Sequence, residues 1–188
     1  MKPDMERNRL WKTLASRAVY TAEPWVRVLD ETLELPNGKV VPSYHRILLP
    51  DYSMVFPVLQ DGRVLMIRSY RQGPGEIVLG FPGGGIDAGE TPEAAAKREL
   101  REETGHSAER IVSLGAGLTG ANVRGAKCHM YMALGCRKVV EPNSGDLEEQ
   151  ELLSLSRDEL AAYLQENRFV ILAYAAIAAR ALLEWKDR

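Results

Sequence analysis

Short apolar runs alternate with turn residues along the first half of the chain, and this pattern predicts β-strands joined by tight connections. Asn37-Gly38 and Asp61-Gly62 each separate two such runs, and both dipeptides are typical of two-stranded hairpins. The segment before them, residues 1–17, carries large apolar side chains around Trp11, and we expect a short helix or an ordered arm there. The predicted strands cover residues 25–33, 40–49, 54–59, 64–70 and 77–81.

The pattern becomes helical after residue 90. Thr91 suits the N-cap because its hydroxyl can accept a hydrogen bond from a backbone N–H of the first turn. Pro92 suits the first helical position, where its missing N–H costs nothing. Gly105 is typical of a helix C-cap. We therefore predict a helix from about Thr91 to Thr104.

The last third of the chain predicts two more helices. Ser156 and Glu159 have the spacing of a capping box, which begins a helix that ends near Leu164. The Ala-rich run at 170–185 predicts a second helix, and Arg180 leaves its apolar stretch too short to cross a bilayer. Two strands are also predicted at 111–115 and 128–134, joined by a glycine-rich connection at 117–127.

Composition limits the class of protein. The chain has 188 residues, 45% of them hydrophobic, which is enough for one globular domain with an extension. The net charge of −2 gives no electrostatic reason to expect nucleic acid as a partner. Two cysteines, Cys128 and Cys136, and a charged N-terminal segment without an apolar signal region lead us to expect a cytoplasmic protein.

Three glutamates share one face of the helix predicted at 91–104. Glu99, Glu102 and Glu103 have the spacing i, i+3, i+4, so their carboxylates lie together and repel one another. A solvated acidic face is one interpretation, and binding of a hard divalent cation such as Mg²⁺ is the other. The run Gly83-Gly84-Gly85 just before the helix favours the second, because glycines let the backbone approach a ligand closely.

These residues form one longer pattern. It consists of Gly84, Glu90, Arg98-Glu99-Leu100, Glu102-Glu103 and Gly105, at fixed spacing. This stretch resembles the Nudix box of the Nudix hydrolase superfamily. His106 is the one departure, at a position where the family usually has an aliphatic residue that packs.

The resemblance implies an α+β fold, in which a mixed β-sheet is sandwiched between helices. It also implies hydrolysis of a nucleoside diphosphate linked to another moiety, with Mg²⁺ or Mn²⁺ as cofactor. Glu99, Glu102 and Glu103 would hold the metal together with the backbone carbonyl of Gly83, and Arg98 would orient these acidic side chains. The resemblance further implies a pairing of Arg98 with Glu90, a structural role for Gly84, Glu90 and Gly105, and a substrate contact at Gly84.

The family often supplies a further glutamate from an acidic loop that follows the second strand predicted above. Here the corresponding stretch is 141–151. Glu148 and Glu149 are the candidates for a general base or further ligand, with Glu151 behind them. A solvated loop is the alternative interpretation for most of these residues.

The region from residue 25 to 70 resembles the N-terminal part of ADP-ribose pyrophosphatase-type members. This resemblance implies an antiparallel β extension at residues 1–52, which would serve as a dimerisation arm, followed by a Nudix domain at residues 53–188. It also implies a homodimer in which both subunits hold the substrate. The substrate-binding candidates are Tyr20, Trp25, Arg27 and Arg71.

Some positions differ from that subgroup. It usually has Glu and Ala where this chain has Gly80 and Gly83, and it favours a proline where this chain has Gly120. Arg124-Gly125-Ala126 lacks an acidic residue that is often found there. We expect hydrolysis of ADP-ribose to AMP and ribose 5-phosphate, or of another nucleotide sugar. The alternatives are a Nudix-fold sensor that binds a nucleotide without cleaving it, and a nucleoside triphosphate or RNA-cap pyrophosphatase.

Overall fold

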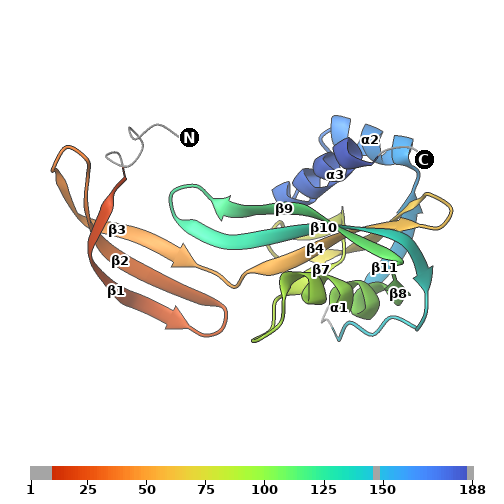
Figure 1. Cartoon of the computed structure of the whole chain (residues 1–188), viewed down its shortest axis with the longest axis horizontal. Coiled ribbons are helices and arrows are strands. Elements are labelled where there is room, and N and C mark those ends of the chain that lie inside the picture. The colour runs from red at the N-terminus through yellow and green to blue at the C-terminus, as the bar shows by residue number, and fades with distance from the viewer. Residues whose placement is uncertain (1–9, 146–148, 186–188) are drawn as a thin grey trace. The chain divides into compact units, whose positions relative to one another are not determined.

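The structure is a computed structural model, and it describes residues 10–145 and 149–185. The chain divides into two compact units, Met1–Pro50 with Leu118–Ala126, and Asp51–Gly117 with Lys127–Arg188. The elements in chain order are β1 (Lys12–Ala22), β2 (Val26–Glu34), β3 (Val40–Leu48), β4 (Tyr52–Leu59), β5 (Val64–Arg71), β6 (Glu76–Gly80), β7 (Gly83–Gly85), α1 (Pro92–Thr104), β8 (His106–Ser107), β9 (Arg110–Gly120), β10 (Arg124–Lys138), β11 (Gln150–Leu155), α2 (Arg157–Gln165) and α3 (Leu172–Glu184) (Figure 1).

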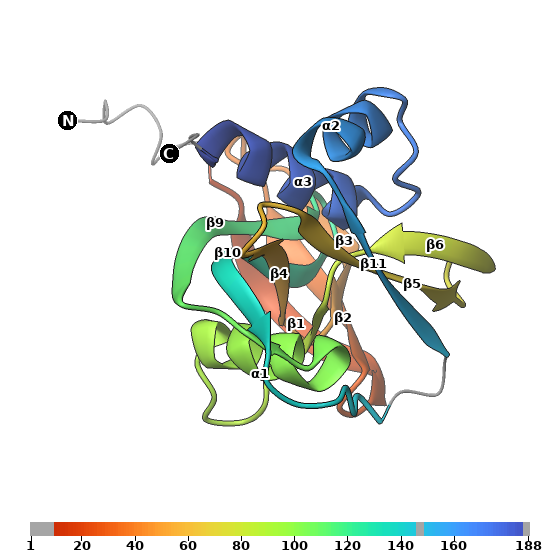
Figure 2. The same cartoon turned by 90° about the vertical axis from the view of Figure 1, so that its right-hand side faces the viewer.

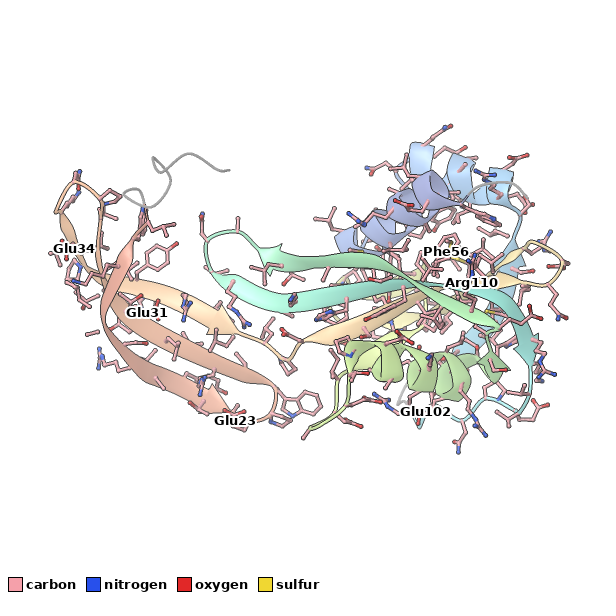
Figure 3. All side chains as sticks on the ribbon, in the orientation of Figure 1. Glu23, Glu31, Glu34, Phe56, Glu102 and Arg110 are labelled. Atoms are coloured by element: carbon pink, nitrogen blue, oxygen red, sulfur yellow. The ribbon has the colours of Figure 1, made fainter. Side chains whose placement is uncertain are left out.

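The first unit is an antiparallel meander of β1, β2 and β3. The predicted hairpin between β2 and β3 is confirmed, with the Asn37 side chain accepting a hydrogen bond from the backbone N–H of Lys39 at 3.0 Å. Glu31 of β2 is buried, and its carboxylate is paired by the Arg46 guanidinium at 3.0 Å and by the Ser16 hydroxyl at 3.2 Å (Figure 3). A buried carboxylate with an ion-pair partner and a hydrogen-bond donor is tolerated.

Of the two alternatives for residues 1–17, a short helix or an ordered arm, the described residues exclude the helix, because residues 12–22 form a strand. β-Branched and aromatic side chains such as Thr13, Val19 and Tyr20 suit an extended backbone. β1 pairs with β2 along its whole length, from Lys12 opposite Glu34 to Ala22 opposite Val26. The backbone hydrogen bonds to β2 outweigh the weak local signal, as sheet pairing commonly does.

The second unit is built on a mixed sheet in which the strand order is β10, β4, β5 and β11. β4 runs parallel to β10 and antiparallel to both β5 and β7, and β6 adds to β5. α1 covers one face of this sheet, and α2 and α3 cover the other (Figures 1 and 2). The α+β fold with a mixed sheet between helices is therefore confirmed.

β4 is apolar on both sides because both faces of the sheet are covered. Phe56 lies in the cluster that packs against α3, together with Leu160 and Ile177 (Figure 3). Val55, its neighbour on the strand, lies in the cluster that packs against α1 with Ala96 and Leu100. Alternate residues of one strand thus hold the helices of both layers, as the two-residue period of a strand requires.

The glycine-rich connection predicted at residues 117–127 is much shorter than expected. β9 continues to Gly120 and β10 begins at Arg124, so only residues 121–123 form the turn. The Thr119 hydroxyl bridges the two strands, since it accepts from the backbone N–H of Ala126 at 3.0 Å and donates to its carbonyl at 3.2 Å. The glycines of this segment lie in the paired strands, whereas the sequence pattern alone predicted a loop.

The helices agree closely with the prediction. The capping box of α2 is present, with the Ser156 hydroxyl accepting from the N–H of Glu159 and the Glu159 carboxylate accepting from the N–H of Ser156. α3 begins at Leu172 rather than at residue 170. In the described ranges, no helix combines the length and apolar character that crossing a membrane requires. Cys128 and Cys136 are buried free thiols.

We expect Leu160→Ala to lower the free energy of unfolding by about 2–5 kcal/mol, because Leu160 is fully buried and truncation leaves a cavity. Urea unfolding followed by circular dichroism measures this change. Leu183→Ala is the matched control, because that side chain is 84% exposed. The control should stay within about 0.5 kcal/mol of the wild type. Equal losses for the two variants would contradict the packing of α2 described here.

Candidate active site

α1 places the three glutamates, and both of its ends are fixed as the sequence predicts. The Thr91 hydroxyl accepts a hydrogen bond from the backbone N–H of Ala94 at 3.2 Å. Gly105 ends the helix in the left-handed conformation with φ of 73°, and a Cβ atom there would overlap the carbonyl oxygen of Val140. Only glycine meets both requirements at this position.

β7 brings backbone directly against the acidic face of α1. The N–H of Gly83 donates to the Glu103 carboxylate at 2.7 Å, and Glu103 is only 5% exposed. A Cβ atom on Gly84 would overlap the carboxylate of Glu99. The Ser53 hydroxyl of β4 donates to the carbonyl of Pro92 at 2.7 Å and ties the start of α1 to the same sheet. The glycines therefore allow the close approach of strand and helix.

Arg98 connects the carboxylates of this site. Its Nε and Nη2 atoms donate to the two oxygens of Glu90, each at 3.1 Å, as the resemblance implies. Its Nη1 atom donates to Glu99 at 2.6 Å and to Glu102 at 3.0 Å, and Nη2 also donates to the carbonyl of Gly85 at 2.8 Å. One guanidinium thus offsets the repulsion between carboxylates that the helical spacing creates.

The ion pairs shift the titration of both partners. Hydrogen bonds from Arg98 hold the pKa of Glu90 below its ordinary value of 4.5, and the backbone N–H of Asp87 adds to this effect. Hydrogen bonds to Glu90 raise the pKa of Arg98 further above its ordinary value, with contributions from Glu99 and Glu102. The carboxylate of Glu90 and the guanidinium of Arg98 are both charged at neutral pH.

The side chains on the acidic face of α1 carry the kind of ligand atoms that a divalent metal requires. Glu99, Glu102 and Glu103 supply carboxylate oxygens, which hard cations such as Mg²⁺ prefer. Gly84 leaves the space that the Glu99 carboxylate occupies. Within residues 10–145 and 149–185, however, no three His, Cys, Asp or Glu side chains are already arranged around a metal position. Arg98 holds two of the three carboxylates instead.

The structure brings the sequence-predicted residues of the Nudix-like stretch together around α1 and β7, and the other candidates lie on other elements of the chain. Glu149 is exposed and lines an open pocket of about 500 Å³ beside β5 and β11. Glu151 lines the same pocket and pairs with Arg68 at 3.0 Å. Glu148 lies outside the described residues. Trp25, Arg27 and Tyr20 are exposed residues of the first unit.

Sequence reasoning missed one residue near the site. Tyr174 of α3 lies close enough to Glu103 and Arg71 for both to influence its titration. Burial is the largest effect and raises the pKa of Tyr174. Nothing in the apolar pattern of α3 distinguishes Tyr174 from a core residue. The one available signal was Gly80, whose missing side chain leaves space for the tyrosine ring.

Comparison with known families agrees with this geometry. Residues 50–175 match the NUDIX domain, and residues 11–47 match the nucleoside diphosphate sugar hydrolase N-terminal domain. The first match alone covers well over half of the chain. The chain therefore belongs to the Nudix family, and the resemblance inferred from the sequence is confirmed.

Individual relatives share about 30% of their residues with this chain. The chain is 30% identical over 173 residues to an ADP-ribose pyrophosphatase of Bacillus subtilis, with 89% of each chain covered. It is 29% identical over 161 residues to a methanol dehydrogenase activator of Bacillus methanolicus, with 84% of each covered. A solved structure described as an ADP compounds hydrolase has a TM-score of 0.79, 24% identity and 93% coverage of both chains. That structure supports the fold alone.

The pairing of Glu90 with Arg98 predicts a pH-dependent contribution to stability. Because folding lowers the pKa of Glu90, the stabilisation is present above pH 4.5 and is lost as the pH falls through the lower, folded-state value. We expect Glu90→Gln to be less stable than the wild type at pH 7, and we expect this gap to narrow on acidification.

Urea unfolding of both proteins at a series of pH values measures this gap. Glu76→Gln is the control, since Glu76 is exposed and forms no ion pair within the described part of the chain. A gap between wild type and Glu90→Gln that stays constant from pH 7 to pH 3 would show that the ion pair is not its source.

Proposed function

We propose that this protein hydrolyses the pyrophosphate bond of a nucleoside diphosphate linked to another moiety. ADP-ribose, cleaved to AMP and ribose 5-phosphate, is the substrate we favour. The observation that carries the proposal is the approach of Gly83 and Gly84 to the carboxylates of Glu103 and Glu99. Two family matches support the substrate class, because they cover both the Nudix region and an N-terminal domain of nucleoside diphosphate sugar hydrolases.

Mg²⁺ is the proposed cofactor, and Glu99, Glu102, Glu103 and the carbonyl of Gly83 would hold it. When bound, the cation neutralises the charge of the diphosphate and lowers the pKa of a bound water. Arg98 keeps Glu99 and Glu102 on one side of α1. The backbone N–H of Gly83 fixes the Glu103 carboxylate by a short hydrogen bond.

Hydrolysis also requires a base to accept the proton of the attacking water. Glu149 is the described candidate, because its exposed carboxylate lies on the loop that leads into β11. Glu148 is the second candidate and lies outside the described residues. A proton acceptor on this loop leaves the carboxylates of α1 available for the cation.

We expect Glu99→Gln to lower the rate of ADP-ribose hydrolysis by at least about 100-fold, more than the 10- to 100-fold typical of losing only an outer-shell partner of a metal ligand. Glu93→Gln is the matched control on the same helix, since Glu93 is exposed and pairs with Lys97. Release of AMP in the presence of Mg²⁺ measures both. Chelation of Mg²⁺ should abolish the reaction, and added Mg²⁺ should restore it.

The same assay includes other nucleotide sugars, dinucleotides and nucleoside triphosphates. Full activity of Glu99→Gln would contradict the metal-site assignment. Faster turnover of triphosphates than of sugar compounds would contradict the substrate class. Tight binding of ADP-ribose with no product would favour a sensor over an enzyme.

We also propose that the first unit joins two copies of the chain as a homodimer. β1 is almost entirely exposed, yet it carries and adjoins large apolar side chains, and such clusters mark interaction surfaces. The exposed apolar residues on or beside β1 are Leu10, Trp11, Leu14, Val19, Tyr20 and Trp25. A second copy of the chain is the proposed partner for this surface.

We expect Leu14→Glu to shift the protein from dimer to monomer, because a buried unpaired carboxylate at an interface is unfavourable. Sedimentation velocity at micromolar concentration measures the change. Leu183→Glu is the control, since this exposed leucine belongs to the other unit. A wild-type protein that is already monomeric would contradict the proposed dimer.

A further inference from the structure

The ring of Tyr174 occupies the space that a side chain at position 80 would need. A Cβ atom built on Gly80 would overlap three ring atoms of Tyr174. The tyrosine is only 9% exposed, and its ring packs edge-on against Phe81 with centroids 6.3 Å apart. The backbone of β6 and the Phe81 ring therefore hold the Tyr174 ring in place.

Two groups of opposite charge flank the phenol. Arg71 at the end of β5 lies within hydrogen-bonding reach of the phenol, and Glu103 of α1 lies near enough to act on it by its charge. Burial raises the pKa of Tyr174, the guanidinium of Arg71 lowers it, and the carboxylate of Glu103 raises it. The phenol hydroxyl can both donate and accept a hydrogen bond.

β5 and β6 place Arg71 on the same side as Tyr174. Gly80 pairs with Ile67 in the β5–β6 ladder. Arg71 is four residues after Ile67 on an unbroken strand, and so it lies on the same face of β5. A side chain that packs over Gly80 thus lies on the face from which Arg71 projects.

In the part of the chain that the structure describes, Arg71 forms no ion pair at 4.0 Å or less, although Glu76 lies opposite it in the β5–β6 ladder. Its Nε atom is buried and lacks a hydrogen-bond acceptor. Buried donors in folded proteins nearly always have a partner, so an orphan donor needs an explanation. A phosphate oxygen is a suitable acceptor, because guanidinium groups bind phosphates through paired hydrogen bonds.

We propose that Tyr174 positions Arg71 to bind a phosphate of the substrate, at the end of the carboxylate face marked by Glu103. Tyr174 is a positioning residue, and Arg71 makes the contact. The phenol suits this role because it can accept a hydrogen bond from the guanidinium without neutralising its charge. The inference rests on the proposed function, since it assumes a substrate with a diphosphate.

A purely structural role for Tyr174 makes a different prediction. If the ring only fills the space above Gly80, then removal of the hydroxyl leaves substrate affinity unchanged. Tyr174→Phe separates the two roles, because it keeps the ring and removes one oxygen atom. Tyr163→Phe is the matched control. Tyr163 of α2 also packs against a phenylalanine, Phe169, and its ring lies beneath an arginine, Arg168.

The experiment measures the Kd of ADP-ribose by calorimetry without added metal, and the KM and kcat of its hydrolysis by steady-state kinetics with Mg²⁺. We expect Tyr174→Phe to raise Kd and KM about tenfold, the effect of losing one hydrogen bond to a charged group, with a much smaller change in kcat. Tyr163→Phe should match the wild type in both assays. Arg71→Lys should raise Kd at least as much, and adding Tyr174→Phe to it should bring little further loss, because the two residues act as one unit.

Each outcome decides one claim. Wild-type hydrolysis with an unchanged KM in Tyr174→Phe would overturn the inference and leave the proposed function intact. Wild-type binding without hydrolysis, weakened by Tyr174→Phe, would overturn the proposed function and support the positioning role. Full additivity of Arg71→Lys and Tyr174→Phe would also overturn the inference. A wild-type protein that neither binds nor hydrolyses ADP-ribose would overturn both for this substrate.

Discussion

The acidic face of α1 depends on a single guanidinium. Helical spacing brings Glu99 and Glu102 close together, and their like charges would destabilise a helix that lacked a compensating cation. Arg98 supplies that charge and is itself held by Glu90, which lies before the helix. The same arginine also binds the carbonyl of Gly85, so the strand that carries the glycines is fixed to the helix that carries the carboxylates. Helix, preceding loop and β7 therefore form one connected structure.

Local signals predicted most of the fold, because in these segments local and tertiary preferences agree. The cap at Thr91 and the capping box at Ser156 form with the predicted hydrogen bonds, and the hairpin turn predicted at Asn37 is present. The misses occur where pairing with the next strand decides the conformation. β1 forms because β2 offers a long antiparallel partner, and the glycines before residue 121 stay extended because β9 pairs with β10.

Some residues of the candidate site could likewise be predicted from local sequence, and others could not. Spacing along one helix was sufficient to group Glu99, Glu102 and Glu103, and a contiguous motif was sufficient to add Gly84 and Glu90. Tyr174 could not be found by this means, because it reaches the site from α3 only through the fold. Its proximity depends on the absence of a side chain at Gly80, far away in the sequence. The glycine at position 80 indicates a contact only once the structure shows which residue fills the space of its missing side chain.

The position of the carboxylates within α1 has an energetic consequence. The helix runs from Pro92 to Thr104, so Glu99, Glu102 and Glu103 all lie in its C-terminal half. That end of a helix carries the negative pole of the backbone macrodipole, which favours cations and disfavours acidic side chains. The backbone dipole therefore favours positive charge at this end of the helix, and the acidic residues there come at some cost to helix stability. Under the proposed function, binding of a cation would be thermodynamically linked to the stability of the last turns of α1, and the ion would support the helix that holds it.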